Sequence, residues 1–110
     1  MEDIFCRMVK GEIPAKKIYE NKNILVIEDI NPKAKIHLLI FPKRHTASSI
    51  NQNAADQAVG EVFAATRTLA RKFKVEKSGY RVVVNHGSDA GQSVSHIHFH
   101  FLAGEKLKDI

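Results

Sequence analysis

The stretch from Val94 to Leu102 alternates between two kinds of side chain, and this alternation constrains the fold more than any other feature. His96, His98 and His100 are separated by isoleucine and phenylalanine. Side chains at positions i and i+2 of a strand share one face, so the pattern predicts a strand with three imidazoles in a single row. Its opposite, apolar face requires a covering layer, which predicts a sheet with one buried face.

The remaining periodicities predict an α+β domain. Runs of branched apolar residues indicate strands, and apolar residues repeated at three and four positions indicate helices. Short turns between strands, with the helices grouped, favour an antiparallel sheet covered on one face over a doubly wound fold. A chain of 110 residues is long enough for one domain, residues 1–110. The predicted elements are a short helix over residues 3–10 with Asp3 as N-cap, strands over 24–30, 37–41, 80–84 and 94–102, a helix from about Ala54 to about Lys74, and a loop over 85–92.

Composition narrows the class of protein. Seventeen basic residues against twelve acidic ones give a formal charge of +5, which favours anionic partners. The basic residues are scattered and no aromatic platform accompanies them, so we expect no nucleic-acid partner. No apolar run reaches the length of a membrane span, and no secretory signal begins the chain. With a single cysteine, Cys6, no intramolecular disulfide forms, and we expect a cytoplasmic protein without a membrane partner.

Two chemistries compete for the histidine row. Histidines on a strand can bind zinc, but neighbouring side chains on a flat strand lie side by side, and Cys6 has no second cysteine to complete a site. Alternatively, one imidazole is a nucleophile or general base while the others orient it and bind an anion. The row alone does not decide between them.

The residues around the row favour a phosphate. The glycine-containing loop over residues 85–93 leads directly into the histidine strand, and its amides and polar side chains suit an anion. Asp29 ends a predicted strand, where a carboxylate can accept hydrogen bonds from ribose hydroxyls. Neither G-x-G-x-x-G nor G-x-x-x-x-G-K-[ST] occurs, which excludes the common phosphate-binding loops.

These residues resemble the histidine triad superfamily, and specifically its Hint branch. The run from His96 to Leu102 fits the pattern His-x-His-x-His followed by two apolar residues, and it comes directly after Gly91-Gln92-Ser93-Val94. Nearly the whole chain takes part in the resemblance. The other segments that match in order and spacing are Ile4-Phe5, residues 11–16, residues 29–32 and residues 37–45.

The resemblance implies a purine nucleoside phosphoramidate hydrolase that acts on substrates such as adenosine 5′-monophosphoramidate, AMP-lysine and aminoacyl adenylates. It also implies a five-stranded antiparallel sheet with one long and one short helix. Members of this branch are homodimers that join their sheets and pack their long helices at the interface.

The resemblance further implies a role for each matching residue. His98 attacks the α-phosphorus and becomes nucleotidylated, after which water releases AMP. His37 lies behind His98 and orients it, while His96 and Ser93 serve the leaving group. The phosphate is held by His100, Asn85 and the backbone of Gly91, Gln92 and Ser93, and the adjacent Val94 also contacts the nucleotide. The ribose is held by Asp29. The base is flanked by Ile4, Phe5, Met8, Ile27 and Ile30.

Several alternatives remain open at this point. The second enzyme class is a dinucleoside polyphosphate hydrolase of the same superfamily, and a different class is an AMP-binding regulatory module whose turnover is incidental. No cofactor is required if fixed donors neutralise the phosphate, although zinc stays an unfavoured possibility. His45 is expected to be exposed to solvent, and His86 to be an ordinary loop residue.

Overall fold

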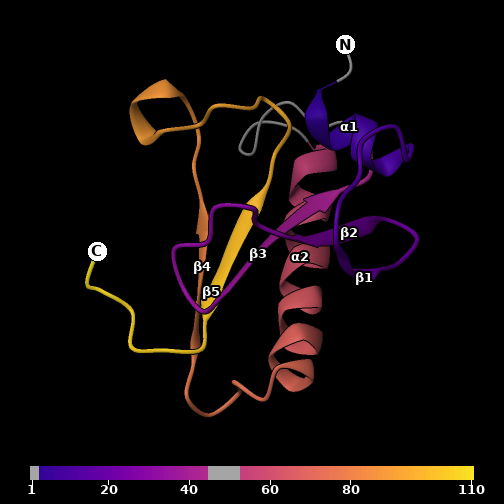
Figure 1. The fold of residues 1–110 in the computed structure, drawn as a ribbon. Coiled ribbons are helices and arrows are strands. Elements are labelled where there is room, and N and C mark those ends of the chain that lie inside the picture. The colour runs from indigo at the N-terminus through magenta and orange to yellow at the C-terminus, as the bar shows by residue number, and fades with distance from the viewer. Residues whose placement is uncertain (1–2, 45–52) are drawn as a thin grey trace.

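A computed structural model describes residues 3–44 and 53–110 of the chain (Figure 1). It is an α+β fold with a five-stranded antiparallel sheet and one short and one long helix, as predicted, and a 3₁₀ turn lies within the predicted loop. In chain order the elements are α1 (Ile4–Val9), β1 (Lys17–Glu20), β2 (Ile24–Glu28), β3 (Ile36–Pro42), α2 (Asn53–Lys72), β4 (Tyr80–Val84), the 3₁₀ turn (Ser88–Ala90) and β5 (Phe99–Ala103).

The sheet has the strand order β1-β2-β3-β5-β4, so β3 and β5 lie side by side although more than fifty residues separate them. Leu39 on β3 pairs with His100 on β5, and His37 pairs with Leu102. Because alternate residues share a face, this register brings His37 and His100 to the same side of the sheet. The strand order therefore assembles the site from two distant segments.

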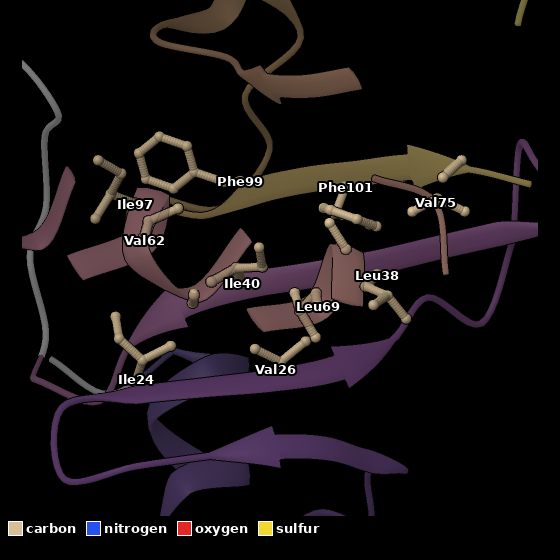
Figure 2. Close-up of a cluster of buried hydrophobic side chains, with 13 residues drawn as sticks. Ile24, Val26, Leu38, Ile40, Val62, Leu69, Val75, Ile97, Phe99 and Phe101 are labelled. Carbon is tan, nitrogen blue, oxygen red and sulfur yellow. The ribbon is translucent and has the colours of Figure 1, made fainter. Parts of the chain in front are cut away.

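Helix α2 covers the other side of the sheet and forms the larger core with it (Figure 2). Leu38 and Ile40 of β3 meet Val62 and Leu69 of α2 in this cluster, together with aromatic residues of β5. The helix presents its apolar stripe because these residues recur at helical spacing. No helix among residues 3–44 and 53–110 is long and apolar enough to cross a bilayer.

Helix α2 ends two residues earlier than predicted, at Lys72. Lys74 adopts a left-handed backbone with φ of 59°, which no longer continues a helix. Its amide donates to the carbonyl of Arg71, and the amide of Val75 donates to that of Ala70. These two bonds form a Schellman motif, which satisfies carbonyls of the last turn and turns the chain toward β4.

The smaller core lies on the face opposite α2 and holds α1 against the sheet. Phe5 of α1 is 5% exposed and packs with Leu25, Ile27 and Phe41, its ring centroid 4.5 Å from that of Phe41. The predicted N-cap is confirmed, since an oxygen of Asp3 accepts from the amide of Cys6 at 2.8 Å. This face therefore has an apolar floor at the end where α1 lies.

Three strand predictions need correction. Strand β1 was not predicted; it is a half-exposed edge strand with a register shift between Lys17 and Tyr19, so it lacks a clear alternation. Strand β2 ends at Glu28 rather than at residue 30, since Asp29 and Ile30 begin a turn. Strand β5 begins at Phe99 rather than at Val94. Residues 94–98 alternate in sequence but pair with no strand, and the pairing of β5 with β3 and β4 begins at Phe99.

Candidate active site

His37 and His100 are joined by a hydrogen bond on the sheet face opposite α2. Their ring nitrogens, Nε2 of His37 and Nδ1 of His100, lie 2.9 Å apart. The carboxylate of Asp29 is 3.4 Å from Nε2 of His37. The three side chains line an open cavity whose other walls are formed by Asn31, Lys33, Val83, Asn85 and Leu102. Hence four of the predicted site residues, Asp29, His37, Asn85 and His100, share one cavity.

The environment of this pair keeps both imidazoles neutral. Burial lowers the pKa of His37, although the charge of Asp29 opposes that shift. Burial also lowers the pKa of His100, and the neighbouring His98 and His37 lower it further. The lowered pKa values favour the uncharged form of both rings at neutral pH, joined by one hydrogen bond.

His98 lies beside this pair with one ring nitrogen fixed. Its Nδ1 is 3.0 Å from the backbone carbonyl of His96, and since a carbonyl only accepts, Nδ1 carries the proton. The lone pair of neutral His98 is therefore on Nε2. Its ring contacts Phe5 at a centroid distance of 4.9 Å and His100 at 5.5 Å. The arrangement presents a half-buried imidazole whose nucleophilic atom is defined.

His96 lies on the same face of the sheet as the other two histidines, at the end that α1 covers, and its ring contacts Phe5 and Phe41 at centroid distances of 5.7 and 5.8 Å. It is fully buried, and its Nε2 donates to the carbonyl of Pro42 at 2.7 Å. Its Nδ1 lies 3.2 Å from a carboxylate oxygen of Asp3 and 3.6 Å from the sulfur of Cys6. The carbonyl of Pro42 and the carboxylate of Asp3 thus give this buried ring polar partners between α1 and the end of β3.

The loop before the histidines is closed on itself. The side-chain oxygen of Gln92 accepts from the amide of Gly87 at 2.8 Å, and the Gln92 amide donates to the Gly87 carbonyl. The amide of Gly91 donates to the carbonyl of Ser88. Two of the three backbone amides predicted to hold a phosphate thus donate within the loop in this structure. Ser93, which follows them, is exposed.

The residues predicted to flank a base divide into two groups. Phe5, Met8 and Ile27 belong to the apolar floor opposite α2, and Val94, predicted to bind the nucleotide, packs against the same cluster. Ile4 and Ile30 are exposed, Ile30 to 91%, and make no wall of the cavity. His86 is exposed in the loop, as expected. The prediction for His45 falls outside the described residues.

Sequence reasoning missed the grouping of Asp3 and Cys6 with His96. One ligand atom from each of these three side chains lies within 4.8 Å of the others. The second such group among the described residues is Asp29, His37 and His100. The D-x-x-C spacing at the N-terminus was the available signal, because both residues lie on the first turn of α1.

The HIT domain family matches residues 10–107. The chain belongs to the HIT domain family. An uncharacterized HIT-like protein of Chlamydia trachomatis is 40% identical over 100% of this chain and 99% of its own length.

Solved structures agree with the family. A histidine triad protein from Clostridium difficile superposes with a TM-score of 0.92 at 38% identity, covering 100% of this chain and 99% of the other. A HIT family hydrolase from Legionella pneumophila gives a TM-score of 0.89 at 38% identity, covering 97% and 96%. A zinc-bound histidine triad family protein from Mycobacterium smegmatis gives 0.77 at 34% identity, covering 90% and 72%. Membership in the superfamily is thus shown by sequence and fold together.

Proposed function

We propose that this HIT protein is a cytoplasmic purine nucleoside phosphoramidate hydrolase that works through a nucleotidyl-histidine intermediate on His98. One observation carries the proposal. Nδ1 of His98 lies 3.0 Å from the carbonyl oxygen of His96, so the proton is on Nδ1 and the Nε2 lone pair is left for attack. A nucleophile needs a free lone pair in a fixed direction, and a donor to the phosphate close by. His100, whose ring is 5.5 Å from that of His98, supplies the donor.

The reaction divides into two displacements at phosphorus. In the first, Nε2 of His98 forms a bond to the α-phosphorus while the P–N bond of the substrate breaks, and the leaving amine takes a proton that the Ser93 hydroxyl relays from water. In the second, water attacks the same phosphorus, the bond to His98 breaks, and AMP is released with a neutral imidazole. Splitting the displacement in this way replaces one difficult step by two easier ones.

The nucleoside would lie across the apolar floor and the cavity. The carboxylate of Asp29 accepts from the Asn31 amide at 2.8 Å and keeps further lone pairs for ribose hydroxyls. Phe5, Met8 and Ile27 would flank the base from the floor, with the exposed Ile4 and Ile30 at its edges. Asn85 and His100 would hold phosphate oxygens, together with the backbone of Gly91, Gln92 and Ser93 once the loop amides turn toward the anion.

Trapping the intermediate tests the proposal directly. The protein is mixed with adenosine 5′-phosphoramidate, quenched, digested and examined by mass spectrometry for one added AMP on His98. His98→Ala should lower turnover at least about a thousandfold while AMP still binds, and the exposed His86→Ala serves as the matched control. Turnover by His98→Ala near the wild-type rate would sink the assignment. Faster cleavage of a dinucleoside polyphosphate would favour the second enzyme class, and AMP binding without turnover a regulatory module.

A homodimer is the partner that the surface favours. Val84 and Tyr80 on the edge strand β4 are 43% and 37% exposed, and Phe63 on α2 is 47% exposed. Gly60 lies one turn before Phe63 with open space beside it. A second copy that packs here would bury the side chains of Phe63, Tyr80 and Val84 and continue the sheet at the β4 edge.

Light scattering after size exclusion measures this. Val84→Lys should shift the protein toward the monomer mass, since it places a charge on the apolar edge. Ile110→Lys, at the fully exposed C-terminal residue, should leave the mass unchanged. A monomeric wild-type protein contradicts the assembly.

A second proposal concerns a metal apart from the reaction. The Nε2 atom of His96 donates to a carbonyl, so in the neutral ring the lone pair is on Nδ1, facing Asp3 and Cys6. Carboxylate, thiolate and imidazole are the donors that zinc accepts. In Asp29, His37 and His100, by contrast, a proton already bridges the two rings. Zinc bound at Asp3, Cys6 and His96 would tie α1 to the segment before β5 and take no part in the reaction on His98.

Metal content is the measurement for this site. Purified protein should contain zinc by elemental analysis, and Cys6→Ala should lose most of it. His98→Ala should retain its zinc, because His98 is not among the three ligands. Equal zinc in Cys6→Ala and wild type, or none in either after zinc is supplied, contradicts the site.

A further inference from the structure

The imidazole of His37 is held by a backbone amide. The N–H of Lys33 donates to Nδ1 of His37 at 2.9 Å. An amide has no lone pair to offer, so Nδ1 must be the acceptor. A neutral His37 therefore carries its only proton on Nε2. The main chain has fixed which tautomer this histidine adopts.

That tautomer fixes the next one. The protonated Nε2 of His37 lies 2.9 Å from Nδ1 of His100 and 3.4 Å from a carboxylate oxygen of Asp29. At the shorter distance Nδ1 of His100 accepts the hydrogen bond. A neutral His100 then keeps its own proton on Nε2, the atom on the opposite edge of its ring.

We infer that the main chain at Lys33 positions the catalytic hydrogen bonds of this site, by setting His100 as an Nε2–H donor toward the phosphate. His98 has the reverse arrangement, because the carbonyl of His96 places its proton on Nδ1. Two histidines two residues apart thus present the same ring atom in opposite roles: Nε2 of His98 attacks, and Nε2 of His100 donates. Lys33 is a positioning residue, and the inference rests on the proposed function only for the identity of the anion.

The turn that carries Lys33 is tied at both ends. The carboxylate of Asp29 accepts from the Asn31 amide, and the Asp29 amide donates to the carbonyl of His37 at 3.0 Å. After Lys33, the amide of Lys35 donates to the side chain of Glu105 at 2.6 Å. Glu105 follows β5, so the segment beyond the catalytic strand holds the turn that sets the tautomer.

Imidazole nitrogen NMR reads the tautomers without any substrate. The protein is labelled with ¹⁵N-histidine and long-range ¹H–¹⁵N correlations are recorded about two pH units above the ordinary imidazole pKa. We expect His37 and His100 protonated on Nε2 and His98 protonated on Nδ1. A His100 protonated on Nδ1 overturns the inference, whether or not the protein hydrolyses phosphoramidates. Conversely, the expected tautomers in a protein that has no such activity would sustain the inference and remove the proposed function.

Variants at Lys33 separate the amide from the side chain. Lys33→Pro removes the N–H, and His100 should become a mixture of both tautomers, with kcat for adenosine 5′-phosphoramidate about tenfold lower, the effect of one hydrogen bond. Lys33→Gln keeps the amide and should keep the wild-type tautomers of His37 and His100. A Lys33→Pro protein with the wild-type tautomer contradicts the inference.

A second pair of variants covers the case in which Lys33→Pro does not fold. Glu105→Ala releases the Lys35 amide, and the ring signals of His37 should broaden or shift toward both tautomers while kcat falls more than KM rises. Glu105→Gln keeps an acceptor and should restore both. Unchanged ring signals in Glu105→Ala would show that the hydrogen bond between Glu105 and the Lys35 amide does not hold the turn, and would overturn the role given to Glu105.

Discussion

Gly104, the residue after β5, offers a quantitative test of how the turn at residues 33–36 is packed. Its φ is +92°, and a Cβ built on it would lie 3.2 Å from Cγ1 of Ile36 and 3.2 Å from Cβ of Lys35. Gly79, the residue before β4, has a similar φ of +104° but nothing within 4 Å of its Cβ. Alanine at the two positions therefore shares the backbone strain and differs in the contact.

The two losses follow from these geometries. A positive φ costs an L-residue about 1–2 kcal/mol. Replacing glycine also removes freedom from the unfolded chain, which offsets about 0.4–1 kcal/mol. Gly79→Ala should therefore lower the free energy of unfolding by about 1 kcal/mol. Gly104→Ala adds the cost of overpacking, about 1–3 kcal/mol, because one of its neighbours is a Cβ that moves only with the backbone. The expected total is about 2–4 kcal/mol.

Urea unfolding at one protein concentration measures both variants against wild type. The ring signals of His37 should shift in Gly104→Ala alone, since only that variant pushes on the turn. Equal losses at the two positions would refute the argument, because they would mean that the contact with Lys35 and Ile36 costs nothing.

Three further predictions concern stability. Asn21→Ala should lower the free energy of unfolding by about 1–2 kcal/mol, because the Asn21 side-chain oxygen accepts from the amides of residues 23 and 24 at 2.9 Å each. Asn21→Asp keeps both hydrogen bonds, so an equal loss in the two variants by urea unfolding contradicts the prediction. Thr66→Val should lower the free energy of unfolding by about 1 kcal/mol in the same assay, since the buried hydroxyl donates to a backbone carbonyl at 2.7 Å. An unchanged free energy of unfolding would show that this hydrogen bond does not stabilise the fold. Burial lowers the pKa values of His37 and His100, so on acidification the unfolded chain binds protons at a higher pH than the folded protein. The melting temperature should therefore fall as the pH drops from the ordinary imidazole pKa toward the lowered values, and it should stay level above the ordinary pKa. A melting temperature that rises on acidification contradicts the assignment.

Elements with a strong period could be predicted from the sequence. The stripe of α2 and the alternation of β5 each reflect a surface half in the core, and the continuous apolar run of β2 reflects a strand buried on both faces. Strand β1 could not be predicted, because it is an edge strand that is covered poorly on both faces and shifts register at Lys17. The C-terminal end of α2 depended on the left-handed backbone of Lys74, a position that more often has glycine.

The site could be predicted residue by residue but not as a geometry. The motif contains three histidines, yet nothing in it says that His96 is buried between Pro42 and α1 while His98 and His100 stay half-buried on the same face. That outcome depends on contacts across 54 and 90 positions of sequence. The proton positions likewise depend on the backbone groups of Lys33 and His96, which carry no signature in the side chains.

The alternation of β5 has a consequence for folding. A strand that slipped by one residue against β3 would turn His100 toward α2 and expose Phe99 and Phe101 on the opposite face. Such a chain would desolvate an imidazole and leave two aromatic rings in water, so the misaligned state is costly on both sides at once. The alternation that places the reacting histidines therefore also favours the correct register of β5 against β3, because a misaligned strand would lose the apolar core.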